Sequence, residues 1–224
     1  EAFSKKKNIV AIPLTNLNEL RREAFTLLDE KRLPVSNYVK KEYFRYVPDF
    51  PSSKLKTCLV PVSKFTPDLL SQYDVVYSPD NIPNTILQLP RVNYTYPEIT
   101  NHVLVGEIGS LYKYHDVDTD FSLNVTNSYT VAFLHALGVK KITLSYELSY
   151  DQINYLINAY QERYHHHPNL EVIIKSRPEV MVSPFSLQSY FHKQPLSLKD
   201  RFSNLYPIIE KNNLMTIYNY QIID

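Results

Sequence analysis

Two polar side chains follow predicted strand ends with a spacing that could support chemistry. Asn124 closes the strand predicted at Phe121–Val125, and Glu147 follows the strand predicted at Lys141–Leu144. A carboxylate beside an amide can orient a ligand or transfer a proton, so Glu147 is the candidate catalytic residue and Asn124 a candidate ligand-binding residue. Alternatively, Glu147 caps a helix that begins near Ser149, and Asn124 satisfies backbone groups of a loop.

Three more polar residues fall near strand ends. Asn127 follows the first of these strands, and Lys175 and Arg177 flank the end of the strand predicted at Leu170–Lys175. The two cations could face an anionic ligand such as a phosphate. Alternatively, they are solvent-exposed residues where the chain leaves the strand. The whole set of candidates predicts a ligand that is polar or anionic.

Other residues have weaker claims to a site. Arg91 and Asp120 are candidates of lower rank, because charged side chains in turns usually form local ion pairs. The run His165–His167 follows a helix end, where successive side chains point in different directions, which favours a polar loop over a metal site. Cys58 is the only cysteine, so this chain can form no disulfide within itself and no metal site of cysteines alone.

The elements that must position these residues alternate between strands and helices. We predict helices at Pro67–Gln72, Asn127–Leu137 and Tyr150–Tyr164. We predict further strands at Lys56–Val62, Val75–Ser78, Thr85–Leu89, His102–Val105 and Met215–Ile223. Alternation of this kind indicates an α/β fold with a mainly parallel sheet, either a partial or a complete TIM-barrel-like domain, in which functional groups gather at the carboxyl ends of strands.

A short strand and helix precede that domain. We predict a strand at Lys7–Leu14 and then a helix capped by Thr15 or Asn16. The segment Val47–Lys54 contains two prolines and two serines and is the best candidate for a linker. The sequence therefore predicts an N-terminal strand-helix segment with its linker over residues 1–54 and a barrel-type domain over residues 55–224.

Charge and hydropathy restrict the partners. The net charge is +1, with 24 basic and 23 acidic side chains, which predicts no strong attraction to nucleic acid. No apolar run reaches the ~18 residues of a membrane span, so we expect no membrane partner. The single cysteine fits a reducing, cytoplasmic setting.

Several separated motifs carry a family resemblance. They are TILQLPRV, VLVGEIGSLYKY, the run from Asp120 to Ser149, VIIKSRPEVMVS, and LKDRFSNLYPI with IYNYQ. Together they resemble the collagenase-like peptidase family U32, in the order that the family shows. The resemblance implies a TIM-barrel-like fold, the C-terminal part of a longer member, and a peptidase (hydrolase) activity by family name. Other members hydroxylate RNA bases or ubiquinone precursors with an iron-sulfur cluster.

One departure from the family changes what the resemblance implies. Ser186 stands where cluster-bearing members have a cysteine, and no cysteine follows between Pro184 and Asp224. Thiolates hold such clusters, so we expect this chain to bind no iron-sulfur cluster and no other cofactor by itself. The expected function is to complete a substrate-holding or catalytic assembly with the remaining N-terminal part of a longer protein, acting on protein or RNA. The alternatives are a non-catalytic binding or scaffold module and a part of an RNA-base hydroxylation factor; whether this chain catalyses a reaction stays open.

Overall fold

The chain divides into two compact units. A computed structural model describes residues 13–32, 46–52, 54–92, 95–191, 196–211 and 214–224. The units are Glu1–Glu42 and Tyr43–Asp224, and each is described by itself. Val47 falls inside the predicted linker but is buried in the core of the second unit, and the Phe50 ring lies 5.3 Å from that of His135. Residues 47–50 therefore pack on the second unit.

The described part of the first unit is one helix, α1 (Leu14–Arg32). It begins earlier than predicted, so Thr15 and Asn16 lie inside it and neither is its cap. The carbonyl of Pro13 accepts a hydrogen bond from the backbone N–H of Asn16 at 3.0 Å, which starts the first turn at the proline. The strand predicted at Lys7–Leu14 falls outside the described residues except at its end, where Leu14 is helical. No helix in the described ranges is both long and apolar enough to cross a membrane.

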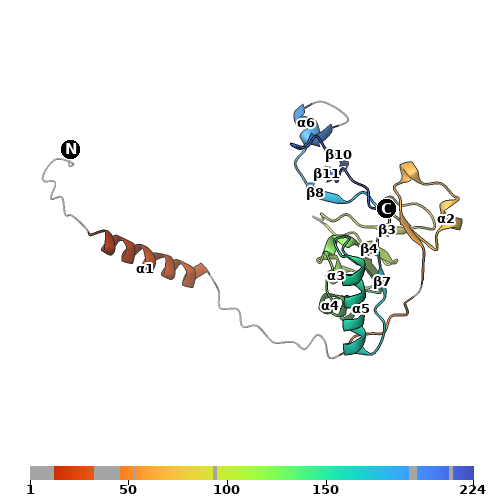
Figure 1. Ribbon diagram of the computed structural model, residues 1–224, viewed down its shortest axis with the longest axis horizontal. Helices are drawn as coiled ribbons and strands as arrows, with labels where there is room; N and C mark the ends of the chain where they lie inside the picture. The colour runs from red at the N-terminus through yellow and green to blue at the C-terminus, as the bar shows by residue number, and fades with distance from the viewer. Residues whose placement is uncertain (1–12, 33–45, 53, 93–94, 192–195, 212–213) are drawn as a thin grey trace. The chain divides into compact units, whose positions relative to one another are not determined.

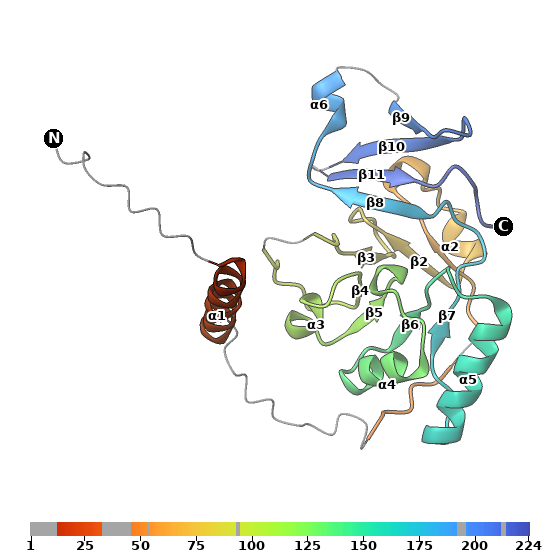
Figure 2. The ribbon, with the colours of Figure 1, turned by 60° about the vertical axis from the view of Figure 1, so that its left-hand side comes forward.

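The second unit is built on a curled parallel sheet of seven strands, which confirms the predicted α/β fold with a partial barrel. The strands pair in chain order. Figure 1 shows the ribbon, and Figure 2 labels β2 to β7 of this sheet. They are β1 (Thr57–Leu59), β2 (Val75–Ser78), β3 (Ile86–Gln88), β4 (Val103–Val105), β5 (Val117–Thr119), β6 (Lys141–Thr143) and β7 (Leu170–Glu171). The connections contain η1 (Val62–Lys64), α2 (Leu69–Gln72), α3 (Ser110–Lys113), η2 (Phe121–Leu123), α4 (Ser128–Ala136) and α5 (Tyr150–Tyr164).

The prediction of a strand at Phe121–Val125 is wrong. The strand at this position in the sheet is β5, which ends at Thr119, and the apolar residues that follow form the 3-10 helix η2. The carboxylate of Asp120 accepts the backbone N–H of Ser122 at 2.8 Å, which caps η2 and stops the extended conformation. Asn124 ends η2 with a left-handed backbone, at φ 50°.

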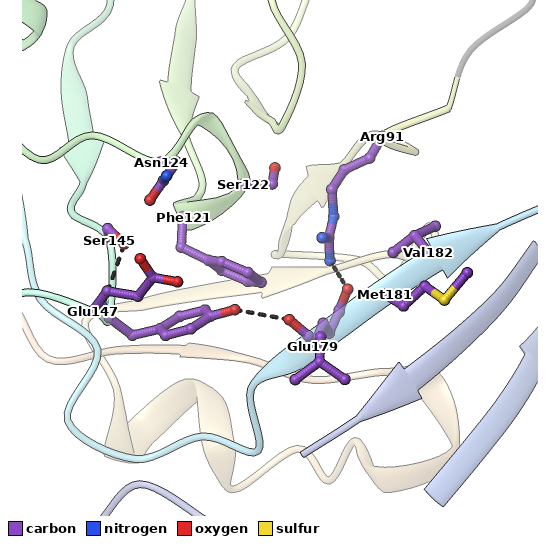
Figure 3. A pocket seen from close by; sticks show the side chains of 11 residues that line it. Arg91, Phe121, Ser122, Asn124, Ser145, Glu147, Glu179, Met181 and Val182 are labelled. Atoms are coloured by element: carbon purple, nitrogen blue, oxygen red, sulfur yellow. Dashed lines mark hydrogen bonds and ion pairs between the residues drawn. The ribbon is translucent and has the colours of Figure 1, made fainter. Parts of the chain in front are cut away.

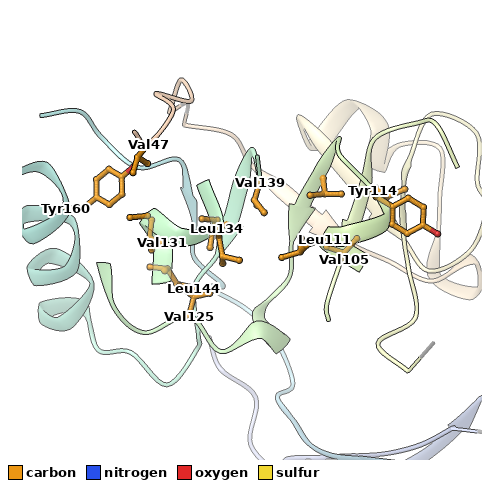
Figure 4. Close-up of a cluster of buried hydrophobic side chains, with 14 of the residues drawn as sticks. Val47, Val105, Leu111, Tyr114, Val125, Val131, Leu134, Val139, Leu144 and Tyr160 are labelled. Carbon is orange, nitrogen blue, oxygen red and sulfur yellow. The ribbon is translucent and has the colours of Figure 1, made fainter. Parts of the chain in front are cut away.

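The main hydrophobic core lies between one face of the sheet and the helices α4 and α5 (Figure 4). Side chains alternate along each strand, so Val103 and Val105 of β4 point into this core while Leu104 points to the opposite face. The core members drawn with labels are Val47, Val105, Leu111, Tyr114, Val125, Val131, Leu134, Val139, Leu144 and Tyr160. This packing fixes the carboxyl ends of β4, β5 and β6 relative to one another.

Charged and polar side chains occupy the concave face of the sheet, where a barrel of this type usually has layers of apolar residues. The Lys141 ammonium lies 2.9 Å from the Glu171 carboxylate and 3.8 Å from that of Asp118. The hydroxyl of Tyr77 donates to Asp118 at 2.8 Å. Thr57 of β1 donates to Glu171 of β7 at 2.9 Å, so side chains join the first and last strands. The buried charges on this face therefore have opposite charges and hydrogen-bond donors as neighbours.

His102 extends this network to the edge of the concave face. Its Nε2 lies 3.0 Å from the Asp118 carboxylate, and its Nδ1 contacts the carboxylate of Asp116. These hydrogen bonds, that to Asp118 first, raise the pKa of His102 above its usual value although burial opposes the shift. Two carboxylates facing both ring nitrogens suit the imidazolium, in which both nitrogens are donors.

We expect the free energy of unfolding to fall as pH rises above about 6.5, the usual pKa of histidine. A pKa that is raised in the folded state adds stability below the unfolded value, and this stability is lost as pH rises through the folded value. The fall should be about 1 kcal/mol, a little less than the stability that a hydrogen bond to a charged group usually contributes. Urea unfolding between pH 5.5 and 8.5 measures it. His102→Gln should flatten this part of the profile, whereas His115→Gln, at an exposed position, should not.

A second, antiparallel sheet follows the parallel one. Its strands are β8 (Glu179–Ser183), β9 (Leu196–Lys199), β10 (Leu205–Lys211) and β11 (Leu214–Tyr218), in the order β8-β11-β10-β9, and α6 (Leu187–Phe191) follows β8. The strand predicted at Met215–Ile223 is β11, and it belongs to this sheet rather than to the barrel. In Figure 2, β8 is the strand of this sheet that lies nearest to the parallel sheet.

Candidate functional site

A cavity of about 250 Å³ lies at the carboxyl ends of the parallel strands, between their loops and β8 (Figure 3). Its walls come from the segments after β3, β5 and β6 and from the first residues of β8. The lining residues are Arg91, Phe121, Ser122, Asn124, Ser145, Tyr146, Glu147, Glu179, Val180, Met181 and Val182. The position agrees with the rule that β/α barrels gather functional groups at this end.

An ion pair between Arg91 and Glu179 crosses one side of the cavity (Figure 3). The Arg91 guanidinium also lies over the ring of Phe121, 4.9 Å from its centroid. Only 21% and 19% of the two side chains are exposed. Burial raises the pKa of the Glu179 carboxyl, and Arg91 opposes this shift. The hydroxyl of Tyr146 donates to the backbone carbonyl of Glu179 at 2.8 Å, so two contacts join β8 to the barrel loops.

A hydrogen-bonded turn after β5 contributes Phe121, Ser122 and Asn124 to the cavity lining. The Asp120 carboxylate accepts from the side-chain amide of Gln88 at 3.0 Å, in addition to capping η2. The Ser122 hydroxyl donates to the carbonyl of Gly106 at 2.6 Å. A Cβ atom at Gly106 would lie 2.5 Å from the Ser122 hydroxyl oxygen and 2.7 Å from Cγ of Arg91. Glycine at this position therefore permits the close approach of the three loops.

The structure brings Glu147 and Asn124 to the same cavity, as the sequence predicts. Glu147 is exposed, and its backbone N–H donates to the hydroxyl of Ser145 at 3.3 Å. It does not cap α5, because Ser149 and Gln152 form the capping box of that helix. The alternative interpretation of Glu147, as the residue that caps α5, is therefore wrong.

The other three candidates lie away from the cavity lining. Asn127 caps α4 and accepts the backbone N–H groups of residues 129 and 130 at 3.1 and 2.9 Å. Lys175 pairs with the side chain of Asp224 at 2.7 Å, and Arg177 donates to the carbonyl of Asn219 at 3.2 Å. Strand β7 ends at Glu171, so neither cation stands at a strand end. Each of the three side chains therefore has a structural contact outside the cavity.

The charges that line the cavity do not favour an anion. One cation and two carboxylates are present, Arg91 against Glu147 and Glu179, and Arg91 pairs with Glu179 rather than with Glu147. The expectation of an anionic ligand depended on Lys175 and Arg177, which lie elsewhere. Glu147 instead suits a ligand that carries a cationic or hydrogen-bond-donating group.

The residues considered for metals lie apart. Within the described ranges, no three or more His, Cys, Asp or Glu side chains form a group that could hold a metal ion. Cys58 is half-buried on β1, and burial raises the pKa of its thiol. The Ser186 hydroxyl donates to the carboxylate of Glu210 in β10 at 2.6 Å. His166 lies 3.5 Å from Asp49, whereas His167 contacts Gln161, as expected of a polar loop.

Comparisons with family models, with curated proteins and with solved structures found no match to this chain, so the resemblance to family U32 stays a prediction.

Proposed function

We propose that the second unit is the substrate-holding part of a U32-like, collagenase-like peptidase assembly, and that its cavity binds a polar segment of a polypeptide. The observation that carries the proposal is the convergence of groups from three strand ends and from β8 on one cavity at the carboxyl end of a parallel sheet. Catalysis in such an assembly would depend largely on groups that this cavity does not supply.

A polypeptide suits the lining better than RNA does. Phosphate groups would meet the carboxylates of Glu147 and Glu179, while Arg91 is already paired. A lysine or arginine side chain could pair with Glu147, and the amide of Asn124 can both donate to and accept from a peptide group. The apolar walls, Phe121 and Met181, would contact aliphatic parts of the same segment.

A second candidate is a binding module that takes part in no reaction. The observation that favours it is Ser186, which stands at the family's cysteine position and is held by Glu210 in a structural hydrogen bond. Both candidates require a polypeptide in the cavity. They differ in whether a longer protein that contains this domain hydrolyses what it binds.

Glu147→Gln should weaken the binding of lysine-containing peptides from denatured collagen about tenfold, the size expected for the loss of one charge-assisted hydrogen bond. The free energy of unfolding should change by less than about 0.5 kcal/mol, because Glu147 is exposed and caps no helix. Isothermal titration calorimetry on the full chain measures the first quantity, and urea unfolding the second.

Glu162→Gln is the matched control, because this residue is exposed on α5 and does not line the cavity. It should leave peptide binding unchanged. A single-stranded RNA oligonucleotide belongs in the same titrations. Tighter binding of the RNA than of every peptide, with no effect of Glu147→Gln, would contradict the proposed function and support the RNA-modification alternative.

A further inference from the structure

One wall of the cavity is the edge of a strand rather than its face. Four consecutive residues of β8, from Glu179 to Val182, line the cavity. Successive side chains of a strand point to opposite faces, so a cavity on one face would be lined by alternate residues only. The cavity therefore runs along the backbone edge of β8. Figure 3 agrees, because the other strands of the antiparallel sheet lie on the far side of β8 from Asn124 and Glu147.

This edge has backbone groups without a strand partner. Strand β8 is first in the sheet order β8-β11-β10-β9, so within the described ranges it pairs with β11 alone. The Tyr146 hydroxyl donates to the carbonyl of Glu179, so this carbonyl, at the first residue of β8, faces the barrel loops. Val180 and Met181 are 52% and 50% exposed, so the edge also carries accessible apolar side chains. Open, apolar strand edges are templates for pairing with another strand.

We propose that an extended polypeptide segment adds to the free edge of β8 as a further strand and places a basic side chain against Glu147. The inference rests on the proposed function, and it specifies how the polypeptide is held. Backbone hydrogen bonds to β8 give affinity for any extended chain, whereas side-chain contacts in the cavity give selectivity. Strand β8 has five residues, so at ~3.3 Å per residue it matches a segment of about five to seven residues.

A polypeptide is the occupant that this surface fits. A strand edge presents N–H donors and C=O acceptors in alternation, and another peptide backbone offers the complementary alternation. A nucleic acid backbone offers phosphate acceptors but no row of donors, and its charge opposes Glu147 and Glu179. The excess of one carboxylate over cations in the cavity lining selects a basic segment among polypeptides.

Backbone methylation of the ligand tests the mode of binding without any change to the protein. The probe is a seven-residue peptide of alternating threonine and valine with a central lysine, acetylated and amidated at its ends. Two derivatives carry N-methyl groups on alternate residues, one on the odd-numbered set and the other on the even-numbered set. An added strand uses the N–H groups of only one set, because the other set points away from β8.

We expect one methylated derivative to bind the full chain at least about tenfold more weakly than the parent, and the other to bind within about threefold. Equal affinities for all three peptides would overturn strand addition and leave the proposed function standing, because side chains alone would then hold the peptide. No binding of any of the three at millimolar concentration would overturn both. A concentration-dependent dimer that excludes the parent peptide would assign the edge to a second copy of the chain and also overturn the inference.

Discussion

Lys141→Met should lower the free energy of unfolding by about 3 kcal/mol, because it leaves the largely buried Glu171 carboxylate without a cation and leaves Asp118 with His102 as its remaining cation. The Lys141 ammonium pairs with Glu171 and lies near Asp118, and only 11% of its side chain is exposed. Methionine keeps most of the side-chain volume, so the loss of stability comes from the missing charge rather than from a packing defect. Urea unfolding followed by circular dichroism measures the change.

Lys140→Met is the matched control, since it removes the same charge from the adjacent residue. The Lys140 side chain is 50% exposed and pairs with Asp116 at 2.8 Å at the surface, so its loss should cost less than about 1 kcal/mol. Equal costs for the two variants would show that the concave face is open to water and that its ion pairs are screened.

The sequence predicts the architecture well where apolar residues recur at regular spacing. Strand β2 and helix α5 have the predicted bounds, because both stretches have strong local signals, an apolar run and a capping box. Strand β5 was missed, because the apolar run after it is longer than the strand. The signal that identifies β5 is the alternation of Asp116, Asp118 and Asp120 with Val117 and Thr119, which places the acidic side chains on one face of the strand and Val117 and Thr119 on the other.

The candidate site could be predicted in part. Asn124 and Glu147 follow neighbouring strands, so the pairing of β5 with β6 brings them to one edge of the sheet even though the first strand was placed too late. Glu179 was missed because its strand, β8, belongs to a different sheet, and no local pattern indicates that β8 lies over the barrel end. Arg91 was ranked low for the same reason, since its partner lies 88 residues away in the chain.

Arg91→Met should lower the free energy of unfolding by about 2 kcal/mol, because it leaves the Glu179 carboxylate buried without a cation. Burial already raises the pKa of Glu179, and removal of Arg91 should raise it further. A pKa raised in the folded state gives stability below the unfolded value that is lost as pH rises. The destabilisation should therefore be largest near pH 7 and smaller below about pH 4.3, the usual pKa of glutamic acid.

The double variant Arg91→Met with Glu179→Gln separates charge from packing. It should regain most of the lost stability, because no buried charge remains without a partner. Lys175→Met is the control for loss of a cation, since its 68% exposed side chain pairs with Asp224 at the surface and should contribute less than about 1 kcal/mol. If the double variant is no more stable than Arg91→Met, the packing of Arg91 on Phe121 accounts for the stability that Arg91 contributes. The ion pair would then not be what holds β8 against the barrel loops, and the cavity wall would depend on the Tyr146 contact instead.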